Sequence, residues 1–162
     1  MLYTRRIRVL LAAVLSGALC GVPTGCGGAL RSVRSVLHMK GSLTMMVQVA
    51  PMANNNWPID VDVVMVHDAK LLKQLTGMSA KDWFAKRTDM ERTAPGKLQT
   101  VSWQWVPGQK VGTVVVRGTA VADGVVLFAN YATKGDHRAL LPHGGKLMIQ
   151  FAAKDFELGP AK

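Results

Sequence analysis

The two cysteines of the sequence, Cys20 and Cys26, are the side chains best placed for covalent chemistry. A cysteine thiolate is a nucleophile, and at the end of an exported bacterial leader it accepts a lipid. Thr24 and Gly25 are the small residues expected just before a modified cysteine, which favours Cys26 as the lipidated first residue of the mature chain. Pro23 stands where an aliphatic residue is usual, and Cys20, which follows a leucine, is the alternative.

The residues before Cys26 have the composition of a signal peptide. Arginines at positions 5, 6 and 8 form a basic head, and residues 9–22 form an apolar segment that small residues follow. This segment is too short to span a bilayer, which needs about 20 residues. Two glycines follow Cys26 in place of the aspartate that commonly retains lipoproteins at the inner membrane, which predicts the periplasmic face of the outer membrane. An ordinary secretory signal with two incidental cysteines is the other interpretation.

Other residues of catalytic or metal-binding types occur in two places. One set lies in a short stretch: Asp60, Asp62, His67 and Asp68. Alternation along a strand puts its histidine on the face opposite to the first two aspartates, so the four side chains do not converge. His137 and His143 lie in one predicted loop, but no nucleophile accompanies them. We therefore expect no metal, no cofactor and no enzymatic activity.

A run of three asparagines followed by a tryptophan is the candidate binding segment of the chain. It lies between two predicted strands, at a loop tip where binding residues concentrate. Asparagines tolerate the left-handed conformations of tight turns, whereas an exposed tryptophan is a typical interface anchor. Two interpretations stay open: Trp57 binds a partner together with Asn54, Asn55 and Asn56, or it caps the end of the core.

Hydrophobic periodicity predicts the elements that position these residues. Alternation of apolar and polar residues predicts six strands, at about 43–49, 59–67, 98–106, 111–117, 125–132 and 146–152. Residues 135–145 are expected to be a loop, and Phe156 and Leu158 to continue the last strand. Trp103 and Trp105 are expected to share a buried sheet face.

The period changes to that of a helix over about 68–93, with Asp68 and Ser79 in the positions of helix N-caps. Val64 and Val66, which are apolar on the outer side of their strand, indicate that another element covers that end of the sheet. Six strands with one helical insertion predict an all-β fold, a small antiparallel β-sandwich.

Composition limits the remaining possibilities. Residues 26–42 are small and basic and are expected to form a tether, which leaves 43–162 as one domain without cysteines. The formal net charge is +10 at pH 7, but the basic residues are spread along the chain. This distribution is typical of a solvated surface and predicts no nucleic-acid partner.

The order of these segments is distinctive. A lipidated leader and a strand precede the asparagine loop, and Pro58 then leads into an alternating strand up to Val66. A leucine-rich helix, an aromatic helix, a Pro-Gly turn at 106–109 and an apolar strand ending near Tyr131 follow, and then a loop with His137 and Arg138. This layout, from about residue 43 to 158, resembles that of the TssJ lipoproteins of bacterial type VI secretion. The sequence departs from the family after the second strand, where Val66-His67-Asp68 replaces the usual Tyr-Gln-Leu.

The resemblance implies a transthyretin-like β-sandwich tethered to the outer membrane. It further implies a structural role in which the protein docks the periplasmic C-terminal part of the inner-membrane protein TssM, in a trans-envelope complex with TssL. In this family the loop between the first two strands contacts TssM, and here that loop is Pro51 to Trp57. A pilotin or chaperone-like periplasmic lipoprotein of another envelope secretion machine is the alternative.

Overall fold

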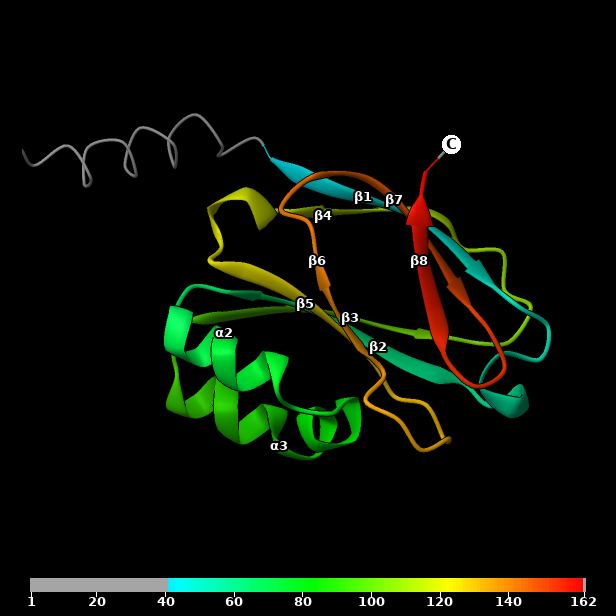
Figure 1. Cartoon of the computed structure of the whole chain (residues 1–162), viewed down its shortest axis with the longest axis horizontal. Helices are drawn as coiled ribbons and strands as arrows, with labels where there is room; N and C mark the ends of the chain where they lie inside the picture. The colour runs from blue at the N-terminus through cyan, green and yellow to red at the C-terminus, as the bar shows by residue number, and fades with distance from the viewer. Residues whose placement is uncertain (1–40, 162) are drawn as a thin grey trace, which may run out of the picture.

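Alternating apolar residues form eight strands in the computed structural model, which describes residues 41–161. One sheet, sheet A, has the strand order β4-β1-β7-β8, and the other, sheet B, has the order β3-β2-β5-β6. The strands are β1 (Ser42–Val49), β2 (Ile59–Val66), β3 (Leu98–Trp105), β4 (Gly112–Arg117), β5 (Gly124–Ala129), β6 (Arg138–Leu141), β7 (Gly145–Phe151) and β8 (Phe156–Pro160). The two sheets face each other across a shared core, so the predicted β-sandwich is confirmed (Figure 1).

The core between the sheets contains the residues that the alternating pattern assigned to it. In β1, Leu43, Met45, Val47 and Val49 are buried, while Gln48 is exposed. Burying each such side chain contributes about 1.5–3 kcal/mol. The buried Trp105 packs edge-on against Phe151 of the facing sheet, with 5.0 Å between ring centroids. Trp103 stacks on Trp105 at 5.7 Å and is half-buried, so the predicted face is correct but its two tryptophans are buried to different extents.

The strand pairing differs from the predicted pattern in three respects. β1 and β7 pair in parallel, while the other pairings are antiparallel. The short strand β6 occupies part of the segment predicted to be a loop, pairing with β5 from Arg138 to Leu141. β8 is a separate strand that turns back along β7, because a tight turn at 152–155 reverses the chain there.

Two helices follow β2, α2 (Ala69–Thr76) and α3 (Ala80–Thr93), and form the predicted helical insertion. The carboxylate of Asp68 accepts the Leu71 N–H at 2.9 Å, and the hydroxyl of Ser79 accepts the Asp82 N–H at 3.2 Å, as expected of N-caps. The Lys97 ammonium donates to Asp68 at 2.9 Å and, together with the helix N–H group, lowers the pKa of that carboxyl.

The helices cover the outer face of sheet B (Figure 1). Val64 and Val66 are buried beneath them, as their apolar outer side indicated. The ring of Trp83 in α3 stacks on Phe128 of β5, with centroids 5.1 Å apart. Its indole N–H donates to Asp62 at 2.8 Å, which supplies the hydrogen bond that this buried carboxylate needs. Asp62 therefore lies on the outer face of its strand and is nonetheless buried.

The predicted signal peptide, Cys20, Cys26 and nearly all of the predicted tether lie outside the described residues. Within residues 41–161, neither helix has the length and apolar character needed to cross a bilayer.

Candidate partner-binding loops

The loop between β1 and β2 owes its shape to its asparagines. Asn54, Asn55 and Asn56 have φ angles of 48°, 52° and 68°. These angles lie in the left-handed region, which costs most side chains about 1–2 kcal/mol and which asparagine tolerates better than most. The short 3-10 turn η1 (Ala53–Asn56) results and directs the chain back into β2.

Asn54 is a structural residue of this loop. Its side chain is 2% exposed. Its amide nitrogen donates to the Pro58 carbonyl at 2.9 Å, and its amide oxygen accepts the N–H of Ala132 at 2.7 Å. The binding role predicted for all four loop residues stays a prediction. The structure divides them, because Asn54 faces inward while Asn55, Asn56 and Trp57 are exposed.

Trp57 does not cap the core. Its side chain is 67% exposed, and that of the nearby Met52 is 61% exposed. The core at this end is closed instead by Trp105 and Phe151, which are buried. Of the two interpretations that the sequence left open for Trp57, the structure therefore excludes core-capping.

Three further loops contact the β1–β2 loop directly. The turn at 106–111 meets it where the Gly108 N–H donates to the Ala50 carbonyl at 3.0 Å. The turn at 152–155 accepts the backbone N–H groups of Asn54 and Asn55, each at 3.1 Å. The loop at 130–137 contributes the bond from Ala132. We call these three the flanking loops, and together with the β1–β2 loop they form one end of the sandwich.

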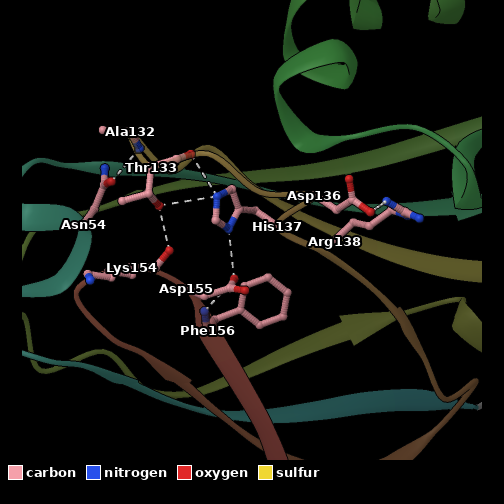
Figure 2. A network of polar contacts seen from close by, with 9 residues as sticks. All are labelled: Asn54, Ala132, Thr133, Asp136, His137, Arg138, Lys154, Asp155 and Phe156. Carbon is pink, nitrogen blue, oxygen red and sulfur yellow. Dashed lines mark hydrogen bonds and ion pairs between the residues drawn. The ribbon is translucent and has the colours of Figure 1, made fainter.

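His137 fastens two of the flanking loops to each other (Figure 2). Its ring is buried, and its Nδ1 lies 3.0 Å from the carboxylate of Asp155. Its Nε2 lies 3.0 Å from the Thr133 carbonyl, and its backbone has a φ of 45°. The sequence singled out this histidine but not Thr133 or Asp155, because the contacts join segments that are far apart in the chain.

The series Asp155, His137 and Thr133 does not form a catalytic triad. A triad needs a hydroxyl whose proton is directed at the histidine. Here the Thr133 hydroxyl donates to the Lys154 carbonyl at 2.7 Å and lies 3.4 Å from Nε2. His143, the second histidine of the predicted loop, is hydrogen-bonded at the opposite end of the sandwich, where its Nδ1 lies 3.2 Å from the Thr119 carbonyl. The contacts of both histidines are structural.

The acidic cluster noted in the sequence is likewise dispersed. Asp60 accepts a hydrogen bond from Gln104, Asp62 from Trp83 and Asp68 from Lys97. Among residues 41–161, no three side chains of the histidine, cysteine, aspartate or glutamate types are placed to hold a metal ion.

A cavity of about 420 Å³ separates the start of α3 from the loop at 130–137. Tyr131 lines it and packs against the ring of His137, with centroids 4.9 Å apart. Burial, and to a lesser degree the charge of Asp155, raise the pKa of the Tyr131 hydroxyl well above its ordinary value. The hydroxyl is therefore uncharged at any physiological pH.

The β1–β2 loop and the start of β1 lie at opposite ends of the sandwich (Figure 1). β1 starts at Ser42, beside the end of β4, and the β1–β2 loop begins after its last residue, Val49. At about 3.3 Å per residue, a strand of this length separates the two ends by about 25 Å.

Solved structures share this architecture. TssJ1, a type VI secretion lipoprotein of Pseudomonas aeruginosa, is similar with a TM-score of 0.57 and 13% identity, over 76% of this chain and 98% of that chain. The fold is that of the TssJ lipoproteins. Serratia marcescens Lip, a membrane-bound component of the type VI secretion system, is similar with a TM-score of 0.53 and 14% identity, over 73% of this chain and 96% of that chain.

A third similar chain belongs to a structure of the TssM C-terminal domain from EAEC, with a TM-score of 0.51 and 14% identity, over 75% of this chain and 99% of that chain. No protein-family model matches the sequence, and no curated protein is significantly similar to it. The structural similarity to TssJ1 and Lip confirms, at the level of the fold, the resemblance to TssJ drawn from the order of segments.

Proposed function

We propose that the protein is a TssJ-type lipoprotein that is lipidated at Cys26 and held at the periplasmic face of the outer membrane. There it binds the periplasmic C-terminal region of an inner-membrane TssM protein, and it contributes structure to the complex without catalysing a reaction. The observation that carries the proposal is the exposed Trp57, presented by a hydrogen-bonded loop at one end of a TssJ fold.

The position of that loop supports the proposal. A lipid attached before Ser42 would hold one end of the sandwich at the membrane. The β1–β2 loop lies at the other end and would face the periplasm, from which a partner rooted in the inner membrane would approach. The relative placement of anchor and loop thus suits a protein that links two membranes.

The composition of the loop supports it as well. Trp57 and Met52 provide exposed apolar surface, and the neighbouring Asn55 and Asn56 provide exposed amides. Binding energy at interfaces concentrates in a few such aromatic anchors ringed by polar contacts. The hydrogen bonds that hold Asn54 fix the loop before binding, which lowers the entropy lost on association.

Recovery of partners from detergent-solubilised envelopes tests this function. The full-length protein and the variants Trp57→Ala and Leu140→Ala would each be captured through a C-terminal affinity tag. Leu140 is a control of similar exposure, because it is 61% exposed on the edge strand β6 and lies outside the four loops. We expect TssM with the unmutated protein and with Leu140→Ala, and much less with Trp57→Ala. Recovery of a ring-forming outer-membrane protein in place of TssM would instead support the pilotin function.

A further inference from the structure

Each flanking loop carries one exposed lysine. Lys110 lies in the turn at 106–111, Lys134 in the loop at 130–137 and Lys154 in the turn at 152–155. Among the residues that the structure describes, none of these three ammonium groups forms an ion pair. The β1–β2 loop that the three loops contact has no charged residue between Ala50 and Pro58.

The acidic residues of the same loops do not neutralise these lysines. Asp155 is engaged by His137 at 3.0 Å, and Asp136 by Arg138 at 2.6 Å (Figure 2). Asp60, at the start of β2, accepts hydrogen bonds from Gln104 and Asn130. Lys110, Lys134 and Lys154 thus have no acidic ion-pair partner among residues 41–161.

We propose that Lys110, Lys134 and Lys154 form a basic rim around the apolar Met52 and Trp57, and that this four-loop surface binds an acidic protein surface with an apolar recess for the tryptophan. This inference rests on the proposed function and specifies the chemistry of the partner's face. It also enlarges the binding surface from one loop to four.

The fold holds the backbone of the rim in place. The flanking loops are tied to the β1–β2 loop through Asn54, Asn55 and Ala50, and two of them are tied to each other through His137. The lysines therefore extend from fixed backbone positions, while their side chains adapt to the partner. Such a rim attracts an acidic surface at long range, which raises the association rate more than it lowers the dissociation rate.

Ionic strength provides the first measurement. Association of the full-length protein in detergent with the purified periplasmic C-terminal region of TssM would be followed between about 0.05 M and about 0.5 M salt, where screening shortens the range of charge interactions severalfold. We expect the association rate to fall by about tenfold or more over this range. A rate that does not change with salt would overturn the basic rim.

A charge-matched pair of variants locates the effect. One variant replaces Lys110, Lys134 and Lys154 with glutamate. The control replaces three exposed, unpaired lysines of other elements with glutamate: Lys73, Lys86 and Lys146. We expect the rim variant to associate about tenfold more slowly and to lose its salt dependence, while the control variant keeps both. A glutamine version of the rim variant, with the charge removed but not reversed, should give a smaller loss and guards against misfolding.

The outcomes separate this inference from the proposed function. If Trp57→Ala abolishes binding while the rim variant binds normally, TssM docking stands and the basic rim is wrong. If the rim and control variants lose affinity equally, net charge accounts for the effect and the rim is again wrong. If the unmutated protein does not bind TssM at any salt concentration, the proposed function fails, together with the partner assigned to the rim.

Discussion

The backbone N–H of Ala132 donates to the side-chain oxygen of Asn54, 78 positions earlier in the chain, at 2.7 Å. This bond attaches the loop after β5 to the loop after β1. It also explains why the first of three adjacent asparagines differs from the other two. Asn54, which the sequence groups with the candidate binding residues, thus ties two of the candidate loops to each other.

Because of this contact, replacing Asn54 should destabilise the fold more than replacing the exposed Asn55. Asn54→Gly keeps the left-handed backbone accessible but removes the bonds to Pro58 and Ala132, so we expect a loss of about 1–2 kcal/mol in the free energy of unfolding. The control Asn55→Gly removes an exposed amide and should change stability by less than about 0.5 kcal/mol. Urea denaturation of both variants measures the difference. Equal losses of unfolding free energy in the two variants would show that the side-chain bonds of Asn54 add no stability beyond that of an exposed amide.

Trp57 and Trp105 should respond to truncation in opposite ways. Trp57→Ala removes a side chain that is 67% exposed, so stability should change by less than about 0.5 kcal/mol, while binding of TssM should weaken by about 2 kcal/mol or more. Trp105→Ala leaves a cavity beside Phe151 and should cost about 3–5 kcal/mol of stability. Thermal or denaturant melts and a binding titration on the same two variants give both quantities. Large destabilisation by Trp57→Ala would contradict the exposed position of this residue.

The extent of burial is what the sequence pattern predicted least well. Alternation located the inner faces of β1 and β2 because successive side chains of a strand point to opposite faces of the sheet. The pattern made Trp103 and Trp105 equivalent, but β3 is an edge strand of sheet B, and Trp103 is only half-buried. Trp103→Ala should therefore cost less than Trp105→Ala.

The sequence pattern does not predict long-range pairings, because these depend on the topology of the whole fold. The parallel pairing of β1 with β7 depends on the whole topology, and neither strand differs locally from an antiparallel one. The four-residue β6 is too short for alternation to be recognised. The contacts of His137 with Asp155 and of Asn54 with Ala132 join residues whose types are common in plain turns. Only the fold shows that they meet.

Asp62 and Trp83 form a buried polar pair whose removal should be costly. Asp62→Ala leaves the indole N–H of Trp83 without its acceptor and removes the partner of Arg87, so we expect a loss of about 1–3 kcal/mol. The double variant Asp62→Ala/Trp83→Phe removes acceptor and donor together and should lose less than the sum of the single variants. A double-mutant cycle from denaturant melts provides the test, and additive losses would contradict a direct interaction.

The raised pKa of Tyr131 predicts a dependence of stability on alkaline pH. The folded state favours the neutral phenol, so this group contributes stability that is fully present below its unfolded pKa of about 10 and is lost as the pH rises through the higher folded value. In a Tyr3→Phe background Tyr131 is the single tyrosine of the chain. Its phenolate absorbance should appear only as the protein unfolds. Ionisation near pH 10 with an intact circular dichroism spectrum would show that the hydroxyl is accessible.

Lipidation and partner binding should be separable, because β1 separates Ser42, where the described domain begins, from the β1–β2 loop. If Cys26 carries the lipid, Cys26→Ser replaces the nucleophilic thiol by a hydroxyl that does not accept the lipid, and labelling with a palmitate analogue should disappear. Cys20→Ser should label normally. The unlipidated Cys26→Ser protein should be mislocalised and yet bind purified TssM with unchanged affinity, since the flanking loops and Trp57 are unaltered. If Cys26→Ser keeps the label and Cys20→Ser loses it, the lipid is attached to Cys20. If the unmutated protein itself takes up no label, the leader is an ordinary secretory signal.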